Sequence, residues 1–322
     1  MNAAFPILLT GKNGQVGFEL QKLLPRMGNL ISLDRQELDL SKPAEIRRVV
    51  REIQPRLIVN SAAYTAVDQA ETDQAAARAI NSDAPAVLAE EARKICAAVV
   101  HYSTDYVFDG LKDSPYLEDD PTNPLSVYGQ TKLAGEDAIR QIGIPYLIFR
   151  TAWVYSTRGR NFLLTILRLA SQREELRIVR DQTGAPTWCR EIATATVSAL
   201  QKLSWDSNAG SPISRVSGTY HMTSGGATTW FDFARAICEE TAQASASLPW
   251  LTEATSGRPL VVQRILPLTT SEYPTPARRP PYSVLSNDRL FQTFGIRLPK
   301  WRSQLHSVFS CAESKIRDDE NS

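Results

Sequence analysis

Two side chains able to exchange a proton stand four residues apart in the segment YGQTK. Tyr128 carries a phenol and Lys132 an ammonium, and residues i and i+4 lie on one face of an α-helix. Such a pair can take part in proton transfer, but a Tyr-x-x-x-Lys pattern also arises by chance on ordinary helices. The residues around the pair must therefore decide between the two interpretations.

A glycine-rich segment, TGKNGQVG, follows the apolar run PILLT and carries Gly11, Gly14 and Gly17 at the spacing G-x-x-G-x-x-G. In a strand–turn–helix context these glycines permit a tight turn, a close approach of the backbone to a pyrophosphate, and close contact between helix and strand. The free N–H groups of the helix start favour phosphates. We predict dinucleotide binding here, the alternative being a plain strand-to-helix turn.

The residues after the second predicted strand bear on the choice of dinucleotide. Asp34 lies 17 residues beyond Gly17, where a carboxylate accepts hydrogen bonds from an adenosine ribose and favours NAD. The neighbouring Arg35 offers a guanidinium to a 2′-phosphate, so NADPH and NADH both stay open. Asp39 and Leu40 are predicted to bracket the adenine; a solvated loop is the alternative for this segment.

The fourth predicted strand ends in STDYVFDG, which places Ser103, Thr104 and Asp105 at its carboxyl end. Ligands of parallel sheets bind beyond the carboxyl ends of the strands. A polar loop then leads to Tyr128. A strand-end hydroxyl, the Tyr and the Lys on the next helix, and a nicotinamide site between them form a proton relay, which favours the catalytic interpretation.

Short apolar runs alternate with amphipathic stretches in the first half, which is typical of βαβ units. We predict an α/β fold with a Rossmann-type doubly wound parallel sheet: an NAD(P)-binding domain over 1–150, and over 151–322 a smaller lobe that mainly binds substrate and returns some segments to the sheet. The last residues, polar and charged, are predicted to be disordered. Predicted strands are 6–10, 30–34, 56–62, 97–104 and 145–150, and predicted helices are 15–26, 43–54, 72–95, 128–142, 160–173, 190–203 and 229–241.

The amino-acid composition limits the kinds of partner that the chain is expected to bind. The 322 residues include 36 Lys plus Arg against 35 Asp plus Glu, so no overall charge favours nucleic acid or a membrane surface. No apolar run approaches the ~18 residues of a membrane span, and the N-terminus lacks the pattern of a signal peptide. The four cysteines form no C-x-x-C motif and the three histidines are dispersed, which argues against a zinc site and favours a reducing cytoplasm.

The glycine loop, Thr104 and YGQTK together resemble the extended short-chain dehydrogenase/reductase family. Further segments, among them VNSAAYTAVDQAE, VHYSTDYVFDG, FRTAWVYS, DQTGAPT and YHMTSGGATTW, span nearly the whole chain and narrow the resemblance to the dTDP-4-dehydrorhamnose reductases. The resemblance implies transfer of a hydride from NAD(P)H to C4 of a dTDP-4-keto-6-deoxy sugar, dTDP-4-dehydro-β-L-rhamnose.

The same resemblance implies roles for the matching residues. Tyr128 would protonate the alkoxide, Thr104 would hydrogen-bond the sugar carbonyl, and Lys132 would hold the nicotinamide ribose and lower the pKa of the phenol. Residues implied to contact the cofactor are Gly14, Gln15, Val16, Ala63, Tyr64, Thr65 and Tyr102; those implied to contact the substrate are Asp105, Trp153 through its indole face, Arg279 and Ser283. For Trp153 and Arg279 the alternatives are core packing and a solvated loop.

One departure from the family concerns a metal. Members can dimerise through magnesium bound by carboxylates, and Glu19 matches one such position. Where the second carboxylate is expected, Arg190 stands beside Glu191. This displacement argues against a bridging Mg²⁺ and leaves a homodimer open.

Two other functions compete with this interpretation. The first is a different nucleotide-sugar 4-ketoreductase, which would share the catalytic residues and differ in the pocket. The second is a non-catalytic dinucleotide-binding partner that resembles the regulatory β-subunit of methionine adenosyltransferase. The joint presence of Thr104, Tyr128 and Lys132 favours an enzyme.

Overall fold

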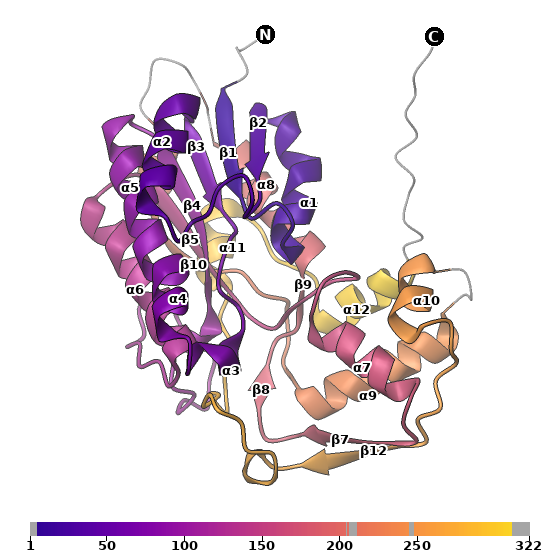
Figure 1. Cartoon of the computed structure of the whole chain (residues 1–322). Helices are drawn as coiled ribbons and strands as arrows, with labels where there is room; N and C mark the ends of the chain where they lie inside the picture. The colour runs from indigo at the N-terminus through magenta and orange to yellow at the C-terminus, as the bar shows by residue number, and fades with distance from the viewer. Residues whose placement is uncertain (1–4, 204, 206–210, 245–247, 311–322) are drawn as a thin grey trace, which may run out of the picture.

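A six-stranded parallel sheet forms the centre of the larger lobe (Figure 1). The computed structural model describes residues 5–203, 205, 211–244 and 248–310; the tail predicted to be disordered lies outside them. Across the sheet the strands follow the order β2 (Asn29–Leu33), β1 (Pro6–Thr10), β3 (Leu57–Asn60), β4 (Ala98–Thr104), β5 (Tyr146–Thr151) and β10 (Gly218–His221). The predicted fold class is confirmed, and the order reverses direction at β1, where doubly wound sheets bind their ligands.

Helices cover both faces of this sheet (Figure 1). Ile7 and Leu9 of β1 pack in one apolar cluster, while Leu8 between them packs in the other. Because both faces are buried, the strands are nearly continuous apolar runs. The first face carries α1 (Gln15–Leu23), α8 (Cys189–Gln201) and α11 (Asp288–Phe294); the second carries α2 (Pro43–Ile53), α5 (Ala84–Lys94) and α6 (Val127–Ile142).

The smaller lobe has its own apolar cluster, which includes Leu163, Phe233, Trp250 and Phe309. A two-stranded parallel pair lies at its edge, with Glu175 to Val179 opposite Arg264 to Leu268. The elements of this lobe are α7 (Phe162–Ala170), β7 (Glu175–Val179), α9 (Trp230–Gln243), α10 (Pro249–Thr255), β12 (Arg264–Leu268) and α12 (Trp301–Ser310). In the described part of the chain, no helix combines the length and apolarity needed to cross a bilayer.

The second half of the chain returns to the sheet through β10, which pairs in parallel with β5 from Gly218↔Leu147 to His221↔Arg150. The sequence analysis predicted no strand there, nor α10, α11 or α12. The helix predicted over 72–95 is also interrupted. It consists of α4 (Gln74–Arg78), a π-helical turn (Ala79–Asp83) and α5, and the π-helical turn contributes Asn81 to the site described below.

A buried ion pair joins α6 to β5. Arg150 is 2% exposed and donates through Nε and Nη2 to the carboxylate of the fully buried Glu136, at 2.9 and 2.7 Å. Two charges out of water are tolerated only when each satisfies the other with good geometry. This pair therefore sets how α6 lies against the edge of the sheet.

We expect Glu136→Gln to lower the free energy of unfolding by about 3–5 kcal/mol, because it leaves the Arg150 guanidinium buried without a counter-charge. Glu52→Gln is the matched control: Glu52 pairs with Arg48 on α2 at the surface, and such pairs contribute about 0–1 kcal/mol. Urea unfolding of both variants measures the difference. Equal losses would contradict the assignment of a stability-determining pair.

Candidate active site

Two of the three glycines in the first loop are required by close packing. Gly11 has φ +76°, and a Cβ there would lie 2.8 Å from the Ala62 nitrogen. A Cβ at Gly17 would overlap the carbonyl oxygen of Gly11. These contacts bring the start of α1 against the loop that follows β3, as the glycine pattern predicted.

Gly14 has a different role, because a Cβ there would meet only the Gly11 oxygen, at 3.2 Å. Gly14 is the N-cap of α1 and has no side chain to bond the first N–H groups, whereas Ser126, Asn161 and Thr229 cap α6, α7 and α9. The N–H groups at the start of α1 therefore remain available to an anion.

The buried Oε1 of Gln15 also has no hydrogen-bond partner in the part of the chain that the structure describes. The open helix start fits the pyrophosphate of a dinucleotide, whereas the Gln15 oxygen can only accept a hydrogen bond and would need a donor, such as a ribose hydroxyl. The side chain of Val16 packs between two apolar clusters, so Val16 can offer a ligand only its backbone.

The segment predicted to hold the adenosine divides into exposed and buried residues. Asp34 accepts hydrogen bonds from the backbone N–H groups of Gln36 and Glu37 and from the amide of Asn13, and these bonds lower its pKa. Arg35 is exposed.

Asp39 is partly buried and accepts from Ser41. Leu40, however, is 5% exposed and belongs to the apolar cluster under α2. The Leu40 side chain is part of the core, so Leu40 can bracket the adenine only with its backbone, and its contact with the cofactor stays a prediction.

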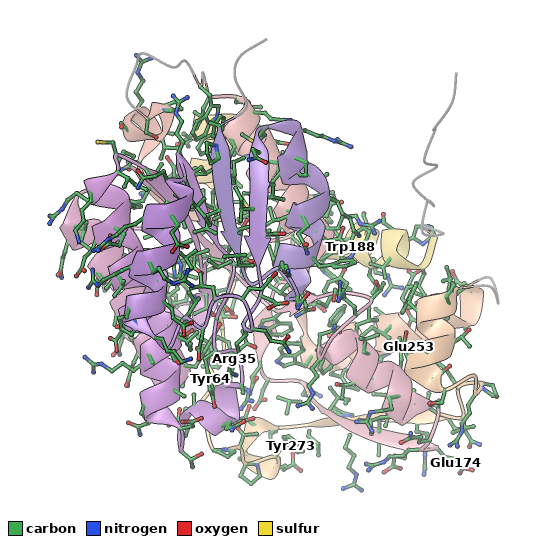
Figure 2. All side chains as sticks on the ribbon, turned by 45° about the horizontal axis from the view of Figure 1, so that its top comes forward. Arg35, Tyr64, Glu174, Trp188, Glu253 and Tyr273 are labelled. Carbon is green, nitrogen blue, oxygen red and sulfur yellow. The ribbon has the colours of Figure 1, made fainter. Side chains whose placement is uncertain are left out.

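The loop after β3 is held by a residue that the sequence analysis missed. Asn81, in the π-helical turn, accepts from the Tyr64 N–H at 2.9 Å and donates to the Tyr64 carbonyl at 3.0 Å. It thereby fixes the segment Ala63–Thr65, which the resemblance places beside the cofactor. Figure 2 shows Tyr64 and Arg35 on the side of the sheet where the carboxyl ends of the strands lie. An asparagine within an alanine-rich helical stretch was the only signal in the sequence.

Thr104 and Tyr128 meet at the carboxyl end of β4. The Thr104 hydroxyl donates to Asp105 Oδ1 at 3.0 Å, and its closeness to Tyr128 lowers the pKa of that phenol. Burial has the larger and opposite effect and raises the pKa of Tyr128 to about 12. The structure thus brings the predicted hydroxyl and phenol together and keeps the phenol protonated at neutral pH.

Lys132 lies one turn further along α6 and is 2% exposed. Its Nζ donates to the carbonyl oxygen of Tyr102 at 2.5 Å and lies 3.3 Å from Nε2 of His101. Burial lowers the pKa of Lys132 to about 8, against the smaller opposing effect of Glu136. The prediction that this ammonium lowers the pKa of Tyr128 is wrong for this structure, because burial dominates at the phenol and Nζ is bonded to β4.

Tyr102 takes part in the site through its backbone and not through its hydroxyl. Its hydroxyl hydrogen-bonds to Thr196 of α8 at 2.8 Å, on the face of the sheet opposite α6. Only its carbonyl, through Lys132, takes part in the site. A strand buried on both faces is apolar on both, so its sequence does not show which face a tyrosine takes.

Of the predicted substrate contacts, Asp105 and Ser283 lie at the site. Asp105 is 2% exposed; burial raises its pKa to about 7, and the nearby Ser283 side chain acts in the opposite direction. Ser283 reaches this position because its N–H donates to the carbonyl of Thr183. Two segments distant in sequence therefore meet beside Thr104.

Arg279 and Trp153 are already engaged by other side chains. Arg279 forms two hydrogen bonds with Asp68, at 3.0 and 2.7 Å, so its guanidinium fork is not free for a diphosphate. Trp153 stacks on Trp230 with ring centroids 3.4 Å apart, and a Cβ at Gly184 would overlap its indole. The predicted stacking of the Trp153 face on a sugar is therefore not supported, and packing explains this residue better.

Glu19, which matches a metal-binding position of the family, is bonded to cations of the same chain. One oxygen of Glu19 lies 3.1 Å from Lys22 Nζ and the other 3.3 Å from Arg190 Nε. This donor set does not fit a divalent cation, and the described residues contain no group of three or more His, Cys, Asp or Glu arranged for one.

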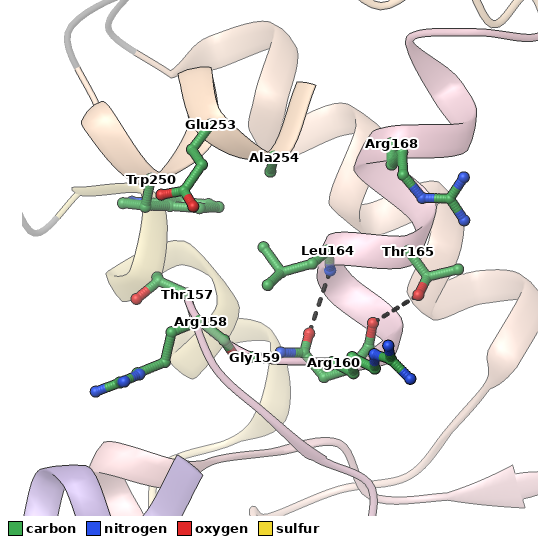
Figure 3. A pocket seen from close by; sticks show the side chains of 11 residues that line it. Thr157, Arg158, Gly159, Arg160, Leu164, Thr165, Arg168, Trp250, Glu253 and Ala254 are labelled. Carbon is green, nitrogen blue, oxygen red and sulfur yellow. Dashed lines mark hydrogen bonds between the residues drawn. The ribbon is translucent and has the colours of Figure 1, made fainter. Parts of the chain in front are cut away.

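A separate cavity of about 740 Å³ lies between α7, α10 and the loop 157–160 (Figure 3). Asn161 lines this cavity; its side-chain oxygen accepts from the Leu164 N–H and its backbone carbonyl accepts from the Thr165 hydroxyl. None of the residues predicted to be catalytic lines this cavity. The predicted catalytic residues therefore lie apart from this cavity.

Comparison with known proteins agrees with this geometry. Residues 5–313 match the model of the family described as the RmlD substrate binding domain. A dTDP-4-dehydrorhamnose reductase of Burkholderia thailandensis is 51% identical over 92% of this chain and 95% of its own.

Two solved structures have similar folds. A dTDP-4-dehydrorhamnose reductase of Clostridium acetobutylicum superposes with a TM-score of 0.83 at 36% identity, over 95% of this chain and 98% of that one. The Bacillus anthracis protein of the same name, solved in complex with NADP, superposes with a TM-score of 0.82 at 31% identity, over 95% and 99%.

We expect Gly14→Ala to weaken NAD(P)H binding by roughly tenfold or more while the fold persists, because the added methyl meets only one atom of the protein but stands where a pyrophosphate must approach. Gly17→Ala should instead destabilise the protein, since its methyl overlaps the Gly11 carbonyl. Fluorescence titration and thermal melting of both variants separate the two effects.

Gly225→Ala is the control for that pair, because the nearest atom to its added methyl is 3.7 Å away. Unchanged cofactor affinity in Gly14→Ala would show that the first helix does not receive the pyrophosphate.

A second expectation follows from the pKa of Lys132. Because burial lowers this pKa to about 8, the ammonium is present below pH 8 and is lost as the pH rises through it. The affinity for NAD(P)H should fall over the same range if the ammonium holds the nicotinamide ribose. Titrations between about pH 6.5 and 9.5 measure this, with Lys132→Met as the variant whose affinity should be weak and flat. A flat profile in the unaltered protein would refute the assignment.

Proposed function

The chain belongs to the RmlD substrate binding domain family, and from that premise we propose that it catalyses the NAD(P)H-dependent reduction of the C4 ketone of dTDP-4-dehydro-β-L-rhamnose to dTDP-β-L-rhamnose. It is an oxidoreductase of dTDP-rhamnose biosynthesis. The observation that carries the proposal is that the Thr104 hydroxyl lies beside the buried phenol of Tyr128 and lowers its pKa. This pair lies at the carboxyl edge of a sheet whose first helix has an open N-terminus.

The protonation states of the site suit reduction. The buried phenol of Tyr128, with its pKa raised to about 12, is protonated at neutral pH and can donate to a sugar carbonyl. Thr104 can present its hydroxyl to the same oxygen. As charge develops on that oxygen, Tyr128 transfers its proton there. The nicotinamide, when bound, supplies the hydride that reduces C4.

Lys132 assists the transfer of the proton from Tyr128. The Nζ of Lys132 lies against β4, where two of its three N–H groups point to Tyr102 and His101. The third N–H group remains for the ribose or for Tyr128. A positive charge near the phenolate left by proton transfer stabilises it. We propose that this contact forms when cofactor and substrate are bound.

Use of both NADPH and NADH is part of the proposal. Asp34 keeps a charged carboxylate for a ribose hydroxyl, and the exposed Arg35 is free to meet a 2′-phosphate. We also propose a cytoplasmic protein, which is supported by the free thiols of Cys96, Cys189 and Cys238. A homodimer stays open, without a Mg²⁺ bridge at Glu19.

We expect Tyr128→Phe to lower kcat by about 10²–10⁴, the usual contribution of a positioned acid, with little change in stability. The assay follows the loss of NADPH or NADH absorbance with the dTDP-4-keto sugar. Tyr220→Phe is the control, because Tyr220 donates its hydroxyl to a backbone carbonyl, that of Val216, outside the site; its kcat should be unchanged.

Near-normal turnover in Tyr128→Phe would remove Tyr128 from the chemistry. Absence of turnover in the unaltered protein, with intact dinucleotide binding, would instead favour a regulatory protein.

A further inference from the structure

A row of buried polar groups leads from Lys132 into the sheet. His101 lies in β4 and is 1% exposed, and its Nδ1 lies 3.1 Å from Nδ2 of Asn60 in β3. The oxygen of Asn60 accepts from the hydroxyl of Thr10 in β1, at 2.7 Å. The three residues lie on three adjacent strands, behind the ammonium that the reaction requires.

The hydrogen bonds of this row depend on one another, because the His101 ring has one acceptor for two neighbouring donors. Burial and the charge of Lys132 lower the pKa of His101 well below its usual value, so its ring is neutral and has one donor and one acceptor. Both neighbours, Lys132 Nζ and the Asn60 amide nitrogen, carry hydrogens. Only one of them can therefore donate to the ring at a time.

Two arrangements satisfy the ring nitrogens of His101. When Lys132 is an ammonium, Nε2 accepts from it and Nδ1 carries the proton. The Asn60 amide must then turn over from the orientation described above, so that its oxygen faces Nδ1 and its nitrogen faces the Thr10 hydroxyl. When Lys132 is an uncharged amine, Nε2–H faces the lone pair of Nζ and Asn60 donates to Nδ1. The tautomer of His101 thus follows the charge on Lys132.

We infer that His101 is a positioning residue for the proposed reduction: held by Asn60 and Thr10, it fixes Nζ of Lys132 against β4 and stabilises its ammonium form. The inference rests on the proposed function for its effect on rate. Its effect on the hydrogen bonds of Lys132 does not depend on turnover.

The other charged and titratable groups around this row do not replace His101. Glu136, on the same helix as Lys132, raises the pKa of the amine, but its carboxylate is bonded to Arg150 of β5. Tyr128 is uncharged at neutral pH. Without the imidazole, the ammonium keeps one acceptor from the described residues, the Tyr102 carbonyl.

The test compares three variants in the dTDP-4-keto sugar assay, with saturating cofactor, across pH. His101→Leu removes the acceptor and should move the alkaline limb of kcat to lower pH by about one unit or more, the weight of a hydrogen bond to a charged group. His101→Gln places an amide near the position of Nε2 and should restore most of the profile.

His221→Gln is the control for the general cost of altering a buried histidine, since His221 is fully buried and bonds to the Ser286 carbonyl outside the site. The alkaline limb of the kcat profile of His221→Gln should stay at the same pH even if this variant is less stable. An unmoved limb in His101→Leu, or equal loss of kcat in His101→Leu and His221→Gln, would overturn the inference.

A second measurement separates this inference from the proposed function. The chain has 3 histidines, so their ring ¹⁵N signals can be assigned by substitution. Replacing Lys132 by Met should change the ¹⁵N shifts of the His101 ring and leave those of His221 in place. Failure of the unaltered protein to reduce the sugar refutes only the function, whereas unchanged His101 signals refute the coupling.

Discussion

The site depends on one constraint: an ammonium is buried without a carboxylate in contact with it. Lys132 is stabilised by a backbone carbonyl and an imidazole of the same strand, and such a charge is tolerated only where the surrounding groups are fixed. That requirement fixes the position of α6 against β4, which the Glu136–Arg150 pair reinforces from the next turn. Tyr128, one turn earlier on α6, meets Thr104 because the helix is held in this way.

The fold and the central pair were accessible from sequence because each depends on short-range periodicity. Alternating strands and helices, the glycine loop and Tyr-x-x-x-Lys are set by backbone geometry within a few residues. The structure then separates the roles of the three glycines: Gly11 and Gly17 permit close packing, while Gly14 leaves the start of the helix open. Strand β10 was not predicted, because a strand of four residues carries little periodic signal and its partner strand lies about 70 residues earlier in the chain.

The partners of the side chains were not accessible, because tertiary packing decides them. Arg279 and Asp68 are 211 residues apart, and Trp153 meets Trp230 from another lobe element; no local pattern connects them. The pKa of Tyr128 was predicted in the wrong direction because charge proximity can be read from spacing but desolvation cannot. His101 was considered only as a metal ligand, although a histidine within an apolar strand needs buried partners for both ring nitrogens.

The π-helical turn Ala79–Asp83 has an evolutionary consequence. It holds Asn81 against Tyr64, and its hydrogen bonds span five residues where those of an ordinary helix span four, so it contains one extra residue. Loss of one residue there would restore regular winding and rotate the preceding segment by about 100° relative to α5. The clamp on the loop beside the cofactor would then face elsewhere. Descendants of this protein can therefore exchange side chains in that turn more readily than they can accept an insertion or a deletion.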